Sequence, residues 1–351
     1  MPDLKLINRT LLLVVVGLCV LGAQSPAGTP LAETRAKFLK VIDRPRVPLA
    51  PDVRALPPDG RRLIQEHITF GADAKERVTA ILVKPLVVAG PRPVVIQLHG
   101  TGGNKEQLLP RLTTLANRGF IGIAIDGRYH GERGSQAEGV ASPYGNAIFK
   151  AFQTGDEHPF FYDTVWDVMR LIDYLGTRKD VDATRIGLGG FSKGGIETYL
   201  AAAVEPRIAV AVAGHGVQSF KWGLDHGAWD SRAWTIRDAI AAAAEETGSA
   251  VSASFIRKFY DRVAPGIYGD FDGPAMLPLI APKPFLVVTG DSDPRTPLAG
   301  VKECAEAAER AYKAAGVPEK FVVKIEPNTG HEQTPAYDEA MVEWFVRWLK
   351  P

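Results

Sequence analysis

A serine between two glycines is the first candidate for chemistry in this chain. Ser192 stands two residues after Gly190 and two residues before Gly194. An apolar run over residues 185–189 precedes this pattern, and residues 195–203 have the composition of a helix. A sharp turn between a strand and a helix, with small neighbours, exposes a serine hydroxyl as a nucleophile. We therefore expect Ser192 to attack a carbonyl carbon; the alternative is a serine that only caps the following helix.

A serine hydroxyl is a poor nucleophile unless a base accepts its proton, and two later segments supply candidates for the base and its acid partner. Gly330 and His331 follow an apolar run over residues 321–325. Asp291 and Asp293 follow a second apolar run. Side chains just past the carboxyl ends of parallel strands meet at the active edge of an open α/β sheet. The pattern predicts His331 as the general base, oriented by Asp293 or, alternatively, by Asp291.

A glycine-rich stretch upstream supplies the remaining part of such a site. Residues 99–104 read His-Gly-Thr-Gly-Gly-Asn and follow a strand-like run. A loop of this kind brings a main-chain N–H close to a substrate carbonyl, and the residue after the nucleophile supplies a second donor. We assign these two oxyanion donors to the main chain of Thr101 and Lys193. His99 and His130 are expected to be structural hydrogen-bonding groups, because one base suffices.

Three further side chains are candidates for a substrate pocket. Tyr129 lies in a loop after a predicted strand, His215 ends another strand, and Trp222 follows in a long stretch that contains several aromatic residues. Most aromatic residues of that stretch are expected to pack it against the body of the protein. The chain has no H-E-x-x-H pattern, and we therefore expect no metal site.

The composition is that of an ordinary globular protein with a sizeable core. The chain has 351 residues, of which 46% are hydrophobic and 23% are charged, which is within reach of one large α/β domain. The formal net charge is +1, and no basic stripe is present. Both observations argue against a nucleic-acid partner. The sequence does not indicate an oligomeric state.

The first residues have the pattern of a secretory signal peptide. Lys5 and Arg9 precede an apolar run over residues 11–21, and Gly22 and Ala23 supply small residues for cleavage. The apolar run of about 11 residues is shorter than the roughly 20 needed to cross a bilayer. We expect cleavage after Ala23, export to the periplasm or the extracellular space, and no stable membrane span afterwards. The alternative is an uncleaved anchor.

The remaining chain divides into an N-terminal segment and one catalytic domain. Residues 24–60 are rich in Pro and Ala and are expected to be irregular. Residues 61–351 begin with two alternating strand patterns and continue with strands and helices in turn, which predicts a mostly parallel sheet with right-handed crossovers. Two insertions, about 131–160 and 216–280, interrupt this alternation. Insertions at the active edge of such a sheet commonly shape the substrate pocket.

The order of these motifs resembles the α/β-hydrolase superfamily, in particular its dienelactone-hydrolase-like and prolyl-oligopeptidase-like (S9-type) serine esterases and peptidases. The resemblance implies a mostly parallel central sheet flanked by helices, with a partly helical, cap-like insertion. It also implies acyl hydrolysis without a metal or organic cofactor, and it favours Asp293 as the triad acid. The segments that carry the resemblance are 98–103, 126–133, 190–194, 280–284, 290–297 and 330–332.

Three functions are compatible with this resemblance. The first is a secreted serine hydrolase that cleaves small-molecule or carbohydrate-linked carboxylic esters. The second is a serine exopeptidase of the prolyl-oligopeptidase type, but only about 60 residues precede the hydrolase, too few for the propeller domain of that class. The third is a non-catalytic binding protein on the same scaffold. Lys193 stands where related sequences often carry Gln, Met or Leu, and a cation beside the oxyanion would favour anionic substrates.

Overall fold

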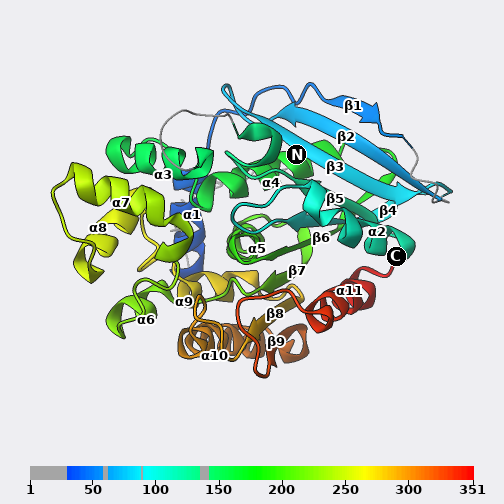
Figure 1. Ribbon diagram of the computed structural model, residues 1–351. Coiled ribbons are helices and arrows are strands. Elements are labelled where there is room, and N and C mark those ends of the chain that lie inside the picture. The colour runs from blue at the N-terminus through cyan, green and yellow to red at the C-terminus, as the bar shows by residue number, and fades with distance from the viewer. Residues whose placement is uncertain (1–29, 58–61, 88–89, 135–141) are drawn as a thin grey trace, which may run out of the picture.

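The computed structural model describes residues 30–57, 62–87, 90–134 and 142–351. The predicted signal peptide, residues 1–23, lies outside these residues. One sheet of nine strands runs through the described part in the order β1-β2-β3-β5-β4-β6-β7-β8-β9, with helices on both faces (Figure 1). This architecture confirms the expected α/β fold class. None of the described helices is long and apolar enough to cross a membrane.

The sheet combines a parallel part with an antiparallel extension. Strands β4 to β9 run parallel to one another, and β1, β2 and β3 continue the sheet beyond β5 in antiparallel pairs. The parallel strands are mostly apolar because helices cover both of their faces. The bounds are β1 (Asp52–Ala55), β2 (Leu63–Gly71), β3 (Arg77–Pro85), β4 (Arg92–Leu98), β5 (Ile121–Ile125), β6 (Val181–Phe191), β7 (Ile208–Gly214), β8 (Phe285–Gly290) and β9 (Phe321–Glu326).

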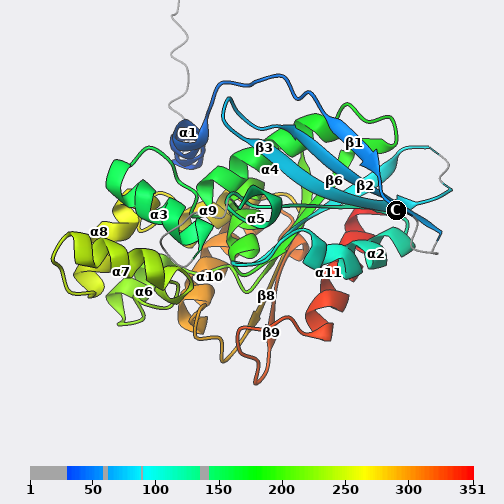
Figure 2. The same ribbon diagram turned by 45° about the horizontal axis from the view of Figure 1, so that its top comes forward.

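Helices cover the two faces of the sheet unequally (Figure 2). On one face, α2 and α11 enclose a smaller apolar cluster with side chains of the central strands. The larger part of the core lies on the other face, under α4, α5 and α10. The bounds are α1 (Pro30–Ile42), α2 (Leu109–Asn117), α3 (Pro143–Thr154), α4 (Tyr162–Leu175), α5 (Lys193–Val204), α6 (Phe220–Asp225), α7 (Arg237–Glu246), α8 (Ala253–Val263), α9 (Gly273–Met276), α10 (Leu298–Ala314) and α11 (Pro335–Leu349), with short 3-10 helices η1 (Glu106–Leu108), η2 (Gly131–Arg133), η3 (Ala233–Ile236), η4 (Leu277–Ile280) and η5 (Pro318–Lys320).

The N-terminal segment is more ordered than its composition indicates. The expectation of irregular structure over residues 24–60 is wrong for the described part, because α1 forms there and β1 joins the sheet. The ring of Phe38 on α1 lies 5.0 Å from the rings of Tyr162 and Phe271, measured between centroids. Only Phe38 and Ile42 of α1 are buried. Such a sparse apolar pattern gives a weak helical signal, and the stabilising partners are distant in the chain.

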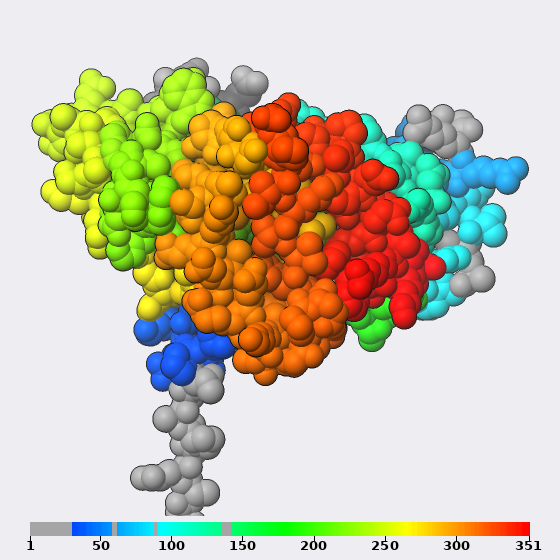
Figure 3. Space-filling view, turned by 90° about the horizontal axis from the view of Figure 1, so that it is seen from below, coloured from blue at the N-terminus to red at the C-terminus, as the bar shows by residue number. Residues whose placement is uncertain are grey.

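The two predicted insertions are helical in part and gather at one end of the molecule (Figure 1). Helix α3 of the first insertion packs against α7 and α8 of the second. The rings of Phe152 and Phe259 stack there with centroids 5.2 Å apart. Seen from below, the second insertion forms a green-to-yellow lobe beside the orange and red C-terminal residues (Figure 3). The insertions thus support each other as well as the sheet.

Candidate active site

Ser192 lies at the sharp turn between β6 and α5. Its backbone has φ +56° and ψ −116°, a strained conformation for a residue with a side chain, and its N–H donates to the Gly214 carbonyl at 2.8 Å. A Cβ atom on Gly190 or Gly194 would stand 2.4 Å from a backbone oxygen, so only glycine fits either position. The Ser192 side chain makes no capping bond to α5, and its hydroxyl is directed to other partners.

The structure brings Ser192, His331 and Asp293 into one line of hydrogen bonds. His331 Nε2 lies 2.7 Å from Ser192 Oγ, and His331 Nδ1 lies 2.8 Å from Asp293 Oδ2. The three residues follow β6, β9 and β8, whose carboxyl ends lie at one edge of the sheet. Asp291, the alternative acid, is exposed and accepts a hydrogen bond from the Ser292 hydroxyl. Asp291 therefore orders its own loop and does not orient the imidazole.

The Asp293 carboxylate holds a second histidine as well. Its Oδ2 atom accepts from Nδ1 of His331 and of His215 at 2.8 Å each, and from the Thr296 hydroxyl at 2.6 Å. Burial alone would raise the pKa of Asp293, but the hydrogen bonds from His215 and His331 outweigh it and hold that pKa well below its ordinary range. Ligand atoms of Asp293 and both histidines lie within 4.8 Å of one another, close enough for a metal ion. Both Nδ1 atoms, however, already donate to the carboxylate.

His331 can accept a proton at neutral pH. Burial lowers the pKa of His331 below the ordinary histidine value, the hydrogen bond to Asp293 opposes this, and the charges of Arg232 and Arg295 lower the pKa further. A neutral ring with its Nδ1–H on Asp293 leaves the Nε2 lone pair facing the Ser192 hydroxyl. This geometry suits general-base catalysis.

A buried histidine fixes the peptide that carries the first expected oxyanion donor. The Gly127 N–H donates to His99 Nε2 at 2.9 Å, so Nδ1 of this ring carries the proton and donates to the Gly100 carbonyl at 2.7 Å. That carbonyl and the Thr101 N–H belong to one trans peptide and point in opposite directions. Holding the carbonyl therefore orients the N–H. A Cβ atom on Gly100 would stand 3.6 Å from Ser192 Cβ, so this loop lies beside the nucleophile.

The second expected oxyanion donor is the main chain of Lys193, and its side chain turns into the protein interior. The Lys193 N–H is the first amide of α5 and has no acceptor within the helix. Its Nζ atom pairs with Glu197 Oε1 at 2.6 Å, and the two side chains are 2% and 1% exposed. Because Glu197 compensates this charge, the structure does not support the expected preference for anionic substrates through Lys193.

A buried ion-pair network ties the glycine-rich loop to the loop after β5. The Asp126 carboxylate accepts from the Lys105 N–H at 2.9 Å, from Lys105 Nζ at 2.8 Å and from the Thr79 hydroxyl at 2.7 Å. Lys105 Nζ also pairs with Glu132 at 2.7 Å. The side chains of Lys105 and Asp126 have no exposed surface. A network this well satisfied makes the loop of Thr101 rigid.

Sequence reasoning missed one charged residue that touches the expected nucleophile. Arg232 lies in the second insertion, just before η3, and is buried. Its Nη1 atom lies 3.3 Å from Ser192 Oγ. No strand end, glycine pattern or motif marks this position in the sequence. The one available signal was a charged residue between Trp229 and Trp234, in an insertion that was expected to shape the pocket.

The three candidate pocket residues lie in different surroundings. Tyr129 lines a cavity of about 290 Å³ together with Thr101, beside the expected oxyanion site. His215 is fully buried against Asp293, the expected triad acid, and has no exposed surface with which to line a pocket in this structure. The ring of Trp222 stacks on His226 with centroids 4.4 Å apart, a contact within the insertion. No contact of Trp222 with the expected triad supports its predicted pocket role.

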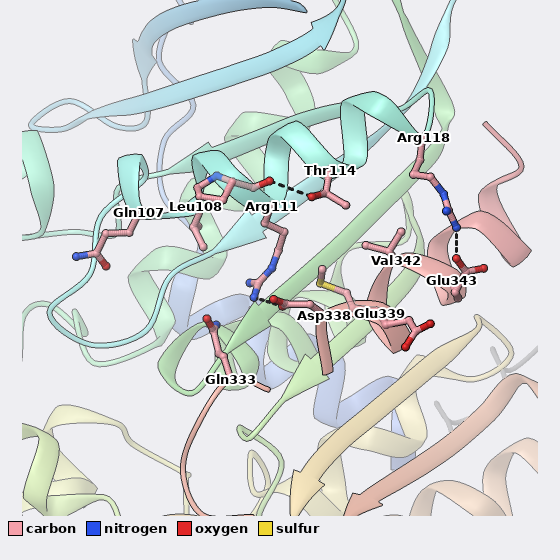
Figure 4. A pocket seen from close by; sticks show the side chains of 12 residues that line it. Gln107, Leu108, Arg111, Thr114, Arg118, Gln333, Asp338, Glu339, Val342 and Glu343 are labelled. Carbon is pink, nitrogen blue, oxygen red and sulfur yellow. Dashed lines mark hydrogen bonds and ion pairs between the residues drawn. The ribbon is translucent and has the colours of Figure 1, made fainter. Parts of the chain in front are cut away.

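A larger cavity of about 420 Å³ lies between α2 and α11 (Figure 4). Arg111 on α2 pairs with Asp338 on α11, and Arg118 pairs with Glu343 farther along the same helices (Figure 4). None of the three aligned residues, from Ser192 to His331, lines this cavity. The larger cavity therefore lies away from the expected active site.

Models of two protein families match the chain. The model of acetyl xylan esterases (AXE1) matches residues 63–218, which include the glycine-rich loop and the glycine-flanked serine. The model of the prolyl oligopeptidase family matches residues 162–351, more than half of the chain. The second range contains Ser192, Asp293 and His331.

Several individual proteins of similar sequence or fold are hydrolases by name. "Putative hydrolase YtaP" of Bacillus subtilis is 27% identical over 306 residues, covering 82% of this chain and 88% of that protein. A 4-O-methyl-glucuronoyl methylesterase of Neurospora crassa is 23% identical over 293 residues, covering 81% of this chain and 67% of that protein. The crystal structure of acetyl xylan esterase 1 from Thermoanaerobacterium superposes with a TM-score of 0.65 at 19% identity, covering 92% and 95% of the two chains. This likeness confirms the α/β-hydrolase fold.

Proposed function

Because this chain belongs to the prolyl oligopeptidase family and has the α/β-hydrolase fold, we propose that it is a serine hydrolase that cleaves carboxylic esters through an acyl-enzyme intermediate. The observation that carries the proposal is the line of hydrogen bonds from Ser192 Oγ through the two nitrogens of His331 to Asp293, at 2.7 Å and 2.8 Å. In this reaction Ser192 is the nucleophile, His331 the base and then the acid, and Asp293 the group that holds the imidazole.

Acylation follows from this geometry. Ser192 Oγ attacks the ester carbonyl carbon, and its proton passes to His331 Nε2. The imidazolium keeps its Nδ1–H on Asp293, whose carboxylate stays ionised and stabilises the positive charge. The tetrahedral intermediate collapses when His331 returns the proton to the leaving alcohol oxygen, so the carbon–oxygen bond of the ester breaks and the acyl group remains on Ser192.

The negative charge of the tetrahedral intermediate needs donors that are already in place. The main-chain N–H groups of Thr101 and Lys193 fill this role, the first oriented through His99 and the second by its position at the start of α5. One such donor is worth about 3–4 kcal/mol of barrier in comparable sites. A water molecule then gives a proton to His331 and attacks the acyl carbon. The bond from this carbon to Ser192 Oγ breaks as His331 returns the proton to Oγ, which releases the acid and restores the serine hydroxyl.

Small-molecule and carbohydrate-linked esters are the proposed substrates. The names of similar proteins point to acetyl groups on xylan in one case and to methyl esters of glucuronic acid in the other. Both are carbohydrate-linked esters. We further propose that residues 1–23 direct export.

Cleavage of peptides is the competing activity, since the family takes its name from oligopeptidases. The match of acetyl xylan esterases over the loop of Thr101 and the turn of Ser192 favours esters. A panel of 4-nitrophenyl esters and aminoacyl 4-nitroanilides on the purified protein separates the two. We expect ester turnover with little anilide turnover, and labelling of Ser192 by a fluorophosphonate probe. Efficient anilide cleavage would favour a peptidase, and the absence of both labelling and turnover would favour a binding protein.

A further inference from the structure

The guanidinium of Arg232 is a fixed hydrogen-bond donor beside the proposed nucleophile. Its Nε atom donates to Gln218 Oε1 at 3.0 Å and its Nη2 atom to the His215 carbonyl at 2.7 Å. The third nitrogen, Nη1, donates to Ser192 Oγ at 3.3 Å. The side chain is 3% exposed. Two anchors therefore hold Nη1 against the oxygen that would carry the acyl group.

No carboxylate of the described residues forms an ion pair with the Arg232 guanidinium, although Asp293 acts on it at longer range. Burial lowers the pKa of Arg232 to about 10, so the group stays protonated at neutral pH. An arginine side chain only donates hydrogen bonds. A buried charged donor that meets an apolar group loses its hydrogen bond without compensation from water.

Acylation changes what Arg232 faces. In the free protein, Ser192 Oγ accepts from Arg232 while it donates to His331. In the acyl-enzyme, the same oxygen is part of an ester, which is a weaker acceptor. The carbon next to the acyl carbonyl is then only two bonds from this oxygen, which Nη1 approaches to 3.3 Å. A methyl or methylene group there leaves Nη1 without a partner. An oxygen bound to that carbon gives Nη1 an acceptor.

We propose that Arg232 forms an acyl subsite that selects esters carrying an oxygen on the carbon next to the ester carbonyl. This inference rests on the proposed ester hydrolysis and adds the substrate class. Hydroxy acids, alkoxy acids and sugar uronic acids have this oxygen, and in a uronic acid it is the ring oxygen. Acetyl groups lack it. Of the two ester types named among similar proteins, the subsite fits the uronoyl type and not the acetyl type.

A matched pair of substrates tests the subsite. Methyl methoxyacetate and methyl butanoate have the same chain length, with an oxygen in place of one methylene group, and methanol release reports kcat/KM for both. We expect the wild-type protein to prefer methyl methoxyacetate by more than the ratio of their alkaline hydrolysis rates. Arg232→Met should lower kcat/KM for the methoxyacetate about 10- to 100-fold, the range for a lost hydrogen bond to a charged group. The butanoate should be affected little.

Three controls keep the outcomes separate. Arg232→Lys keeps the charge but loses the two-point anchor, and we expect a partial loss confined to the methoxyacetate. Lys221→Met removes an exposed cation of the same insertion and should leave both substrates unchanged. Labelling of each variant by a fluorophosphonate reports whether Ser192 and His331 are intact, and circular dichroism reports folding.

The results that would overturn the subsite are specific. An equal loss on both substrates would make Arg232 a general stabiliser of the oxyanion, and no loss on either would leave it structural. The wild-type protein alone could also overturn the subsite. This would follow if its preference for methyl methoxyacetate over methyl butanoate in kcat/KM were no greater than the ratio of their alkaline hydrolysis rates. Failure of the proposed function looks different, because the wild-type protein would then neither turn over any ester nor react with the fluorophosphonate.

Discussion

Two regions of the molecule meet at Ser192, and they place their side chains by different means. On one side are the loops at the carboxyl ends of β6, β8 and β9, which carry Ser192, Asp293 and His331. On the other side is the second insertion, which carries Arg232. The strand-end loops are set by backbone geometry, such as the turn in which the Gly194 carbonyl oxygen excludes a Cβ atom at Gly190 by an approach of 2.4 Å.

The position of Arg232 has no comparable backbone constraint, because its backbone is unstrained at φ −101° and ψ −18°. Arg232 is held by a side-chain bond to Gln218 and a bond to the His215 carbonyl. The helices that follow it pack against α3, which lies in a different insertion. Strand-end loops therefore provide the chemistry that many members of a fold share, and the insertion provides contacts particular to one chain. Changes on the strand-end side should stop the reaction, and changes in the insertion should alter its selectivity or pH dependence.

Ser192→Ala should have the largest effect. Without its hydroxyl the protein can form no acyl-enzyme, and comparable serine hydrolases lose roughly 10⁴- to 10⁶-fold in kcat. Turnover of 4-nitrophenyl acetate and thermal unfolding measure activity and stability. The side chain does not cap α5, but buried Arg232 Nη1 loses its acceptor, so we expect a moderate fall in the unfolding temperature with the fold retained. The exposed Ser249→Ala is the control. Wild-type-like turnover in Ser192→Ala would remove the strand-end loops from the reaction.

His99→Phe should have the next largest effect, again on the strand-end side. The substitution removes one of the two bonds to the Gly100 carbonyl and leaves the peptide that carries the Thr101 N–H held only by the Gly103 N–H at 3.0 Å. We expect kcat to fall about 10²-fold, near the lower end for loss of one oxyanion donor, with KM changed much less. Steady-state kinetics on 4-nitrophenyl acetate separate the two constants. A rise in KM at constant kcat would mean that His99 supports substrate binding and not the oxyanion.

The difference between the strand-end loops and the insertion also explains which features could be predicted from the sequence. The pattern around Ser192 and the histidine after β9 are short segments in which turn chemistry and strand ends coincide, and the parallel sheet follows from the alternation of apolar runs and helices. Asp293 could be separated from Asp291 only through the family resemblance. The contacts of Arg232 and His215 depend on side chains far away in the chain. Helix α1 was missed for the same reason, because Phe38 is buried only through distant rings.

Arg232→Met tests the insertion through the pH dependence of the reaction. The base must be neutral to accept a proton, so kcat/KM rises with pH through the pKa of His331, which lies below the ordinary value of about 6.5. The charged groups that act on this imidazole are Asp293, which raises its pKa, and Arg232 and Arg295, which lower it.

Removing the charge of residue 232 favours the imidazolium, so the acid limb of the profile should move to higher pH. Profiles of kcat/KM for methyl butanoate between pH 4 and pH 9, a range chosen around the histidine pKa, measure the shift. Lys221→Met should leave the profile where it is. If the acid limb of the Arg232→Met profile stayed at the wild-type pH or moved to lower pH, the insertion would not act on the expected base, His331.

Trp222→Ala should have the smallest effect and sharpens the contrast within the insertion itself. The indole is half-buried and stacks on His226, so its removal costs packing, and we expect about 1 kcal/mol of stability to be lost, as for an average substitution. Because no bond joins this ring to Ser192 or His331, kcat/KM for both methyl esters should stay within about twofold, a change below roughly 0.5 kcal/mol. Urea unfolding measures the first quantity and methanol release the second. A tenfold loss on either ester would place Trp222 at the acyl subsite beside Arg232, and selectivity would then be shared by the insertion as a whole and not held by one guanidinium.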